Sequence, residues 1–401
     1  MMTDVKKICI GAFAIRIIAL IIVVSFSNNL TTGFLSSDVI NDDVRYQLGA
    51  ELYAKQAKHI IDSNAIGDAF LRTGDYSVAS GYPFVLWYWI VSIVMYVFHS
   101  HVIVRMMNVL FAVFSVKCIY DIAKQLYGNK VAKYASSLYA FLPYPVFFSC
   151  FLYKDQFYTL LVLLIFRVVL LKGARMELRD FGIVASLIVI STFIRSGLSV
   201  IIAFVVIYVY FKSKRFSISN FNTILIIFAI IIGTYFLFQY NLDSIDRKYE
   251  GYVLNYHDRD RGSGVSSFIA IKEIGHFYRY PLAYIFVMLL PIHTSSSIAS
   301  WGSVVGLLNF VIVPVGLGNL LYLLFWNVRK NSFFWGVQIL YFITIMTSMG
   351  IFRHSYYLQP YMMIFFAAFY LRLKTKEQRM YNYISLFLMF IYFAFLIYNL
   401  Y

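Results

Sequence analysis

Apolar runs of about 20 residues, the length that crosses the hydrocarbon core of a bilayer, recur along the whole of this chain. Residues 8–26 and 303–326 are examples. Hydrophobic residues account for 61% of the 401 positions and charged residues for only 13%, which is more apolar surface than one water-soluble core can bury. Because helices satisfy their own backbone groups in lipid, the sequence predicts an all-α, polytopic membrane protein.

The basic residues gather in short clusters between the apolar runs. The net charge of +15 would also suit a nucleic-acid partner, but no long basic face and no alternation of basic with aromatic residues occurs, so we expect no nucleic acid. The clusters fit instead with cytoplasmic loops under the positive-inside rule. They are Lys6-Lys7, Lys124-Lys130-Lys133, Lys172-Arg175-Arg179, Lys212-Lys214-Arg215, Arg329-Lys330 and Arg372-Lys374-Lys376-Arg379.

Threading one outward and one return segment between successive basic clusters predicts about 11 transmembrane helices in a single integral membrane domain, residues 1–401. The first of them, following Lys6 and Lys7, is expected to be an uncleaved anchor. The predicted spans lie near residues 8–27, 102–122, 132–152, 156–172, 181–194, 198–211, 222–240, 303–326, 333–351, 356–371 and 382–400.

Two long segments fall outside these spans on the non-cytoplasmic side, residues 28–101 and residues 241–300. The first contains the apolar run 82–98, whose Trp and Tyr residues suit an interfacial helix in the headgroup zone. The second is rich in Asp, Arg, Tyr, Gly and Ser. Function is therefore expected at this one face of the membrane.

An acidic pair, Asp42 and Asp43, opens an amphipathic stretch of the first long segment, and Tyr46 follows. Aspartates before a helix commonly serve as N-caps, and that interpretation stays open. The functional alternative is that one carboxylate takes a proton from an acceptor while its neighbour helps to hold a divalent cation.

Lys154 and Asp155 stand between two apolar runs, on the face predicted for Asp42. An acidic residue beside a span is expensive and is a candidate for function, although a salt bridge with Lys154 is an alternative. If Asp42 and Asp155 converge, their oxygen ligands suit Mg²⁺ or Mn²⁺.

Two arginines interrupt apolar runs at predicted outward turns, Arg195 and Arg353, the latter followed by His354. Each arginine could reach lipid headgroups. Alternatively, each guanidinium binds a phosphate in bidentate fashion and stabilises the charge of a lipid-phosphate leaving group.

Three stretches in the first half of the chain follow one another in an order that is typical of a known superfamily. They are DDVRYQLGAELYA, GYPFVLWYW and a long stretch from VRMMN to FLYKD. Through them the chain resembles the GT-C superfamily, and within it the protein mannosyltransferase and aminoarabinose transferase group. The resemblance covers residues 8–200, and beyond them only Arg195-Ser196-Gly197 and the stretch 353–360 look similar.

The resemblance implies a GT-C-like membrane fold and a first-loop aspartate as catalytic residue. Carried over to this sequence, that role falls on Asp42, with Asp43 adjacent and Asp155 as the second acidic position. Arg195, Arg353, His354, Lys154 and Tyr46 are the expected substrate and phosphate ligands. One departure is Lys154, which could neutralise Asp155.

The predicted function is transfer of a sugar from a polyprenyl-phosphate carrier to a lipid-linked glycan, a glycolipid or another envelope acceptor. A repeat-unit polymerase of surface polysaccharide is the nearest alternative, and it would depend on Arg195 and Arg353 more than on Asp42. A flippase for lipid-linked sugars would show inverted repeats and mid-membrane charges, and the sequence shows neither. The expected location is a bacterial inner membrane with the active site facing outward.

Overall fold

The structure is a computed structural model that describes residues 3–27, 86–213, 284–285, 288, 310–325, 332–347 and 352–400. These residues are mostly helical, and no strand occurs among them. The predicted all-α class is therefore confirmed for the described part of the chain. Asp42, Asp43 and Tyr46, and most of the two long outer segments, lie outside it.

The described helices begin and end close to the predicted spans. The α-helices are α1 (Asp4–Ser27), α5 (Leu86–Phe98), α6 (His101–Tyr127), α7 (Asn129–Phe141), α8 (Pro143–Phe148), α9 (Asp155–Lys172), α10 (Leu178–Thr192), α11 (Ser196–Ser213), α16 (Val313–Phe325), α17 (Ser332–Thr347), α18 (Gln359–Tyr370) and α19 (Thr375–Leu400). Three 3₁₀ helices accompany them, η2 (Gly173–Arg175), η3 (Phe310–Ile312) and η5 (Phe352–Leu358).

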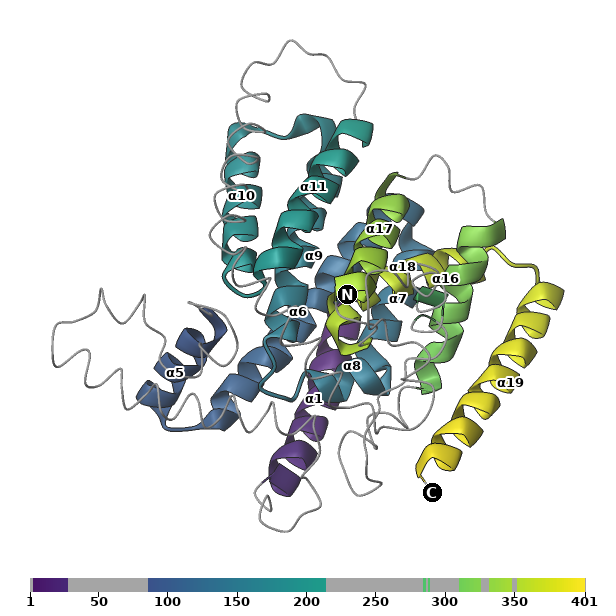
Figure 1. Cartoon of the computed structure of the whole chain (residues 1–401), viewed down its shortest axis with the longest axis horizontal. Coiled ribbons are helices and arrows are strands. Elements are labelled where there is room, and N and C mark those ends of the chain that lie inside the picture. Colours follow the sequence, from purple (N-terminus) through teal and green to yellow (C-terminus); the bar gives the residue numbers. More distant parts are fainter. Residues whose placement is uncertain are drawn as a thin grey trace, which may run out of the picture.

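Helix α6 lies in the middle of the bundle, where it packs against α1, α7 and α9 (Figure 1). Helix α9 in turn packs against α10 and α11, which run side by side. On the other flank α18 packs against α7 and α16, and α19 covers α16 at the edge of the molecule. One continuous apolar core joins most of these helices.

Two described helices are long and apolar enough to cross a bilayer, Asp4–Ser25 and His101–Tyr127. Several shorter apolar helices accompany them, such as Phe310–Leu324. Large apolar side chains also cover outward faces, and in α19 Phe390 is 70% exposed and Tyr383 72% exposed. Such surfaces suit lipid, as expected of a membrane protein, whereas the count of about 11 spans stays a prediction.

The predicted span 132–152 is wrong as a single helix. Leu142 adopts an extended conformation, φ −62° and ψ 134°, because the following Pro143 disfavours a helical residue before it. Pro143 then starts the short α8, where its missing N–H is not needed. After Phe148 the chain stays irregular as far as Lys154.

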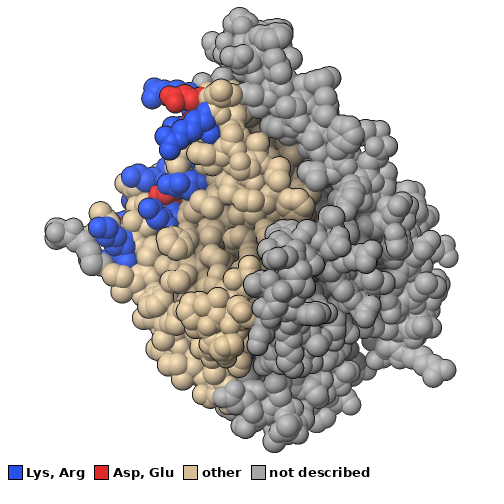
Figure 2. All heavy atoms as spheres, turned by 90° about the vertical axis from the view of Figure 1, so that its left-hand side faces the viewer, with Lys and Arg blue, Asp and Glu red and all other residues tan. Residues whose placement is uncertain are grey.

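Three of the basic clusters, those at residues 6–7, 124–133 and 372–379, lie at one end of the bundle. The Lys133 ammonium lies 2.5 Å from the Asp4 carboxylate, and Arg372 stacks 5.8 Å above the Tyr127 ring. These contacts bring together the start of α1, the α6–α7 turn and the chain after α18. Figure 2 shows Lys and Arg gathered along one edge of the described surface, while the rest of that face is nearly free of charge. This arrangement agrees with the clustering that the positive-inside rule predicts.

Candidate active site

Asp155 is the first residue of α9 and lies at the opposite end of that helix from the basic Lys172. Its side chain is only 2% exposed. The Thr159 hydroxyl donates to the Asp155 carbonyl at 2.7 Å, which fixes the first turn of the helix. A carboxylate buried so deeply is costly unless a donor or a cation compensates it.

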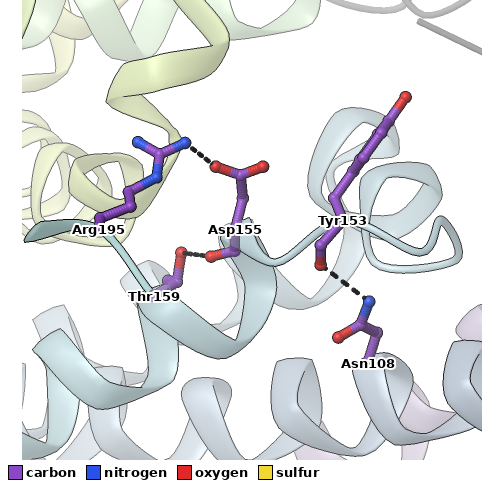
Figure 3. A network of polar contacts seen from close by, with 5 residues as sticks. All are labelled: Asn108, Tyr153, Asp155, Thr159 and Arg195. Carbon is purple, nitrogen blue, oxygen red and sulfur yellow. Dashed lines mark hydrogen bonds and ion pairs between the residues drawn. The ribbon is translucent and has the colours of Figure 1, made fainter. Parts of the chain in front are cut away.

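The compensating cation is Arg195, which comes from the turn between α10 and α11. A guanidinium nitrogen of Arg195 donates to the Asp155 carboxylate in an ion pair, and the two side chains point toward one another (Figure 3). The Arg195 backbone N–H continues the end of α10 by donating to the Ser191 carbonyl at 2.9 Å. Its guanidinium also lies 5.6 Å from the centre of the Tyr158 ring.

The structure thus joins two predicted site residues that are 40 positions apart in the chain. The ion-pair partner that it gives to Asp155 is Arg195, where the sequence had suggested the neighbouring Lys154. Lys154 occupies the N-cap position of α9 and is partly exposed. The Arg195 side chain is 12% exposed, so it is less enclosed than the carboxylate that holds it.

Arg353 and His354 belong to η5, which packs against α9. The Tyr356 hydroxyl donates to Gln156 Oε1 at 2.8 Å, and the Tyr357 ring meets the Tyr158 ring edge-on at 5.2 Å. The backbone that carries Arg353 therefore lies beside the helix that begins with Asp155. The side chains of Arg353 and His354 are outside the described residues.

A buried polar network that the sequence analysis did not single out holds η5 to α9. Gln156 Oε1 also accepts from the Tyr139 hydroxyl at 3.2 Å, and Gln156 Nε2 donates to Ser115 at 3.4 Å. Gln156, Tyr139 and Tyr356 are fully buried. A glutamine beside an acidic residue at the start of an apolar run is the sequence feature that could have indicated this network.

The metal site predicted between Asp42 and Asp155 remains a prediction, because Asp42 and its neighbour Asp43 are not among the described residues. Among those that are described, no group of three or more His, Cys, Asp or Glu side chains could hold a metal ion. Asp155 offers carboxylate oxygens, the donor type that Mg²⁺ and Mn²⁺ prefer. Asp155 is therefore the member of the predicted Asp42–Asp155 metal pair that the structure describes.

Comparisons with known proteins concern the part of the chain that contains the Asp155–Arg195 ion pair. The model of the Alg9-like mannosyltransferase family matches residues 74–253, a stretch that includes both Asp155 and Arg195. The archaeal oligosaccharyltransferase AglB from Archaeoglobus fulgidus, solved with an inhibitory peptide and a dolichol-phosphate, is similar with a TM-score of 0.40 and 12% identity. The alignment covers 79% of this chain and 48% of AglB, so the chain spans about half of that protein's length. No curated protein matches the chain.

The family match spans less than half of the 401 residues, and over residues 74–200 it overlaps the part that carries the resemblance to the GT-C superfamily. The match agrees with the predicted resemblance of this chain to GT-C-type glycosyltransferases.

Proposed function

We propose that this protein transfers a sugar from a polyprenyl-phosphate carrier to a lipid-linked glycan or another envelope acceptor on the non-cytoplasmic face of a bacterial inner membrane. The observation that carries the proposal is the ion pair between Asp155 and Arg195. It lies at the end of α9 that is opposite to the basic Lys172, with η5 packed alongside. A charged pair at this end supports a site on the face opposite to the cytoplasmic clusters.

Arg195 has the chemistry to hold the leaving group. A guanidinium presents five N–H donors in a rigid, planar fork whose geometry matches phosphate oxygens. Because the carboxylate fixes the fork before substrate arrives, the donors need little reorganisation as charge develops on the departing polyprenyl phosphate. Arg353 and His354 on η5, Lys154 beside Asp155, and Tyr46 are the further proposed phosphate and substrate ligands.

The proposed base is Asp42, with Asp43 adjacent. Its carboxylate would take the proton from an acceptor hydroxyl as the oxygen attacks the anomeric carbon of the sugar, and the bond to the carrier phosphate would break. Asp42 and Asp155 would hold Mg²⁺ or Mn²⁺, which supplies charge neutralisation at the phosphate when bound.

The test uses purified protein in proteoliposomes, with every substrate added from outside. Radiolabelled polyprenyl-phosphate mannose serves as donor, because the matched family consists of mannosyltransferases, and an envelope glycolipid extract serves as acceptor. We expect Asp42→Asn to abolish transfer of label while the protein remains inserted. If Asp42→Asn and Asp43→Asn both retain full transfer, the proposal is wrong.

The same assay separates a transferase from a polysaccharide polymerase. A transferase loses more activity in Asp42→Asn than in Arg353→Lys, because the base is essential and lysine keeps the positive charge. A polymerase that depends on its arginines shows the reverse order. Transfer with all substrates outside also excludes a requirement for transport.

A further inference from the structure

The irregular segment between α8 and α9 is buried over residues 149–153 although it forms no regular helix. Cys150, Leu152 and Tyr153 have no exposed surface, and Phe151 is 2% exposed. Irregular backbone inside a membrane protein needs hydrogen-bond partners, because neither lipid nor a helical ladder supplies them. The carbonyl groups of this segment must therefore find donors elsewhere.

Three side chains supply those donors to four consecutive carbonyl groups. Arg105 donates to the Cys150 carbonyl at 3.0 Å, and Trp87 donates to that of Leu152 at 2.8 Å. Asn108 donates from one amide nitrogen to the carbonyls of Phe151 at 2.7 Å and Tyr153 at 3.0 Å. We call Trp87, Arg105 and Asn108 the carbonyl clamp.

The carbonyl clamp is itself buried and comes from elements outside the segment that it holds. Trp87 lies on α5, whereas Arg105 and Asn108 lie one turn apart on α6. Trp87 and Asn108 have no exposed surface, and Arg105 is 1% exposed. Burying a cation and an amide to satisfy a few carbonyls is costly, whereas a regular helix through this segment would satisfy most of them without such side chains.

The clamped carbonyls end two residues before Asp155. Figure 3 shows Asn108 donating to the Tyr153 carbonyl at one side of this turn while Asp155 and Arg195 face each other at the other side. Since Thr159 fixes the Asp155 carbonyl, the clamp and the first turn of α9 together leave the aspartate little freedom. Its carboxylate is thereby directed toward Arg195.

We propose that Asn108, supported by Arg105 and Trp87, is a positioning residue for the Asp155–Arg195 pair. The inference rests on the proposed function, in which that pair acts at the donor phosphate. A loosened clamp would displace the carboxylate and guanidinium without removing either one. Because transition-state stabilisation is sensitive to displacements of an ångström or less, turnover should suffer more than substrate binding.

The experiment compares Asn108→Ala with a matched control elsewhere in the fold. Asn319 on α16 is also buried, at 1% exposure, and its amide nitrogen also donates to two carbonyls, those of Val315 and Met362, both at 2.8 Å. It joins α16 to α18 and plays no part in the proposed site. Both variants lose two hydrogen bonds to backbone, so both should unfold at a lower temperature.

The readout is kcat and KM for transfer of label from polyprenyl-phosphate mannose in proteoliposomes. We expect kcat of Asn108→Ala to fall about 10-fold to 100-fold with little change in KM, and kcat of Asn319→Ala to stay within about twofold of wild type. Equal losses of kcat in the two variants would show a general effect of destabilisation and would overturn the inference. An unchanged kcat in Asn108→Ala would overturn it as well.

A second pair of variants covers the case in which Asn108→Ala fails to insert. Arg105→Lys keeps a donor for the Cys150 carbonyl, whereas Arg105→Met keeps only the length of the side chain. We expect kcat to be retained better in Arg105→Lys than in Arg105→Met, and equal kcat values would contradict the clamp.

Asp155→Asn is measured in parallel. If it keeps full kcat, the proposed role of Asp155 fails, whereas a loss in Asp155→Asn with normal Asn108→Ala refutes the clamp alone.

Discussion

The two ends of α9 each lie beside an ion pair, and the two pairs differ in how far the cation is enclosed. At its first residue Asp155 is 2% exposed and meets Arg195, which is 12% exposed. Past its last residue, the Asp180 side chain is 9% exposed and lies 3.4 Å from the Lys172 ammonium, whose side chain is 50% exposed. A pair with both partners buried needs excellent geometry to offset desolvation, whereas a pair whose cation is open to water depends on geometry less.

Asp180 and Asp155 also differ in what their side chains bind. Asp180 belongs to a capping box, in which it accepts from the Glu177 backbone N–H at 3.0 Å and Glu177 caps the start of α10. This arrangement accounts for Asp180 through local helix structure. Asp155 instead joins α9 to a turn 40 residues away. Local helix structure accounts for Asp180 but not for Asp155, which agrees with the proposal that the Asp155 end carries the function.

The largest effect is expected from Arg195→Met, which leaves the Asp155 carboxylate buried without its guanidinium. Removing one partner of a buried pair costs about 3–5 kcal/mol. The double variant Asp155→Asn/Arg195→Met should recover part of this loss, because it no longer buries a charge. Thermal unfolding in detergent measures both, and a double variant less stable than Arg195→Met would contradict the account.

A smaller effect is expected from Tyr356→Phe, which removes one of the hydroxyl groups that donate to Gln156. Gln156 keeps the Tyr139 hydroxyl, so we expect a loss of about 1 kcal/mol in the free energy of unfolding. The matched variant Tyr357→Phe removes a hydroxyl that contacts Thr344 at 2.6 Å instead. Both should be destabilised alike. If Tyr356→Phe also loses turnover while Tyr357→Phe does not, the network acts in positioning η5.

At the basic end, Gly128 between α6 and α7 has a φ of +88°, which residues with a side chain rarely adopt. Gly128→Ala should therefore lower the free energy of unfolding by about 1 kcal/mol with kcat unchanged. Gly182 in α10 has open space around it, so Gly182→Ala is the control and should be neutral or stabilising. A loss of kcat in Gly128→Ala would show that the basic end also contributes to turnover.

The smallest effect concerns the pH dependence of the capping box. The Glu177 N–H, with the Lys172 ammonium nearby, lowers the pKa of Asp180 below its ordinary value. A lowered carboxyl pKa gives stability that is present above the unfolded pKa of about 4 and is lost as the pH falls through the folded pKa. Asp180→Asn should flatten the fall in melting temperature below about pH 4, measured by thermal unfolding across the acidic range. If wild type and Asp180→Asn show the same dependence of melting temperature on pH, this assignment is wrong.

Much of the helical framework could be predicted from the sequence, because apolar runs and basic clusters report directly on burial and orientation. The same threading placed Arg195 on the membrane face that holds the start of α9, but it did not predict the ion pair with Asp155. The exception was the span that the structure breaks at Pro143, because a hydropathy average over an apolar run gives no weight to the backbone geometry that proline imposes.

The polar contacts around Asp155 were much harder to predict. Trp87, Arg105 and Asn108 act on carbonyl groups of an irregular segment, and no side-chain pattern records where a backbone carbonyl lies. Gln156 acts through tyrosines that resemble ordinary core aromatics in the sequence. The roles given to Asp42, Asp43, Tyr46, Arg353 and His354 stay predictions, since they depend on side chains outside the described residues.

The most direct test of the difference between the two ends of α9 is the kcat of Asp155→Asn beside that of Asp180→Asn in the same proteoliposome assay. The two substitutions make the same chemical change at acids that each pair with a cation. We expect Asp155→Asn to lower kcat about 100-fold or more and Asp180→Asn to leave it within about twofold of wild type. Equal kcat values in the two variants would contradict the assignment of function to the Asp155 end.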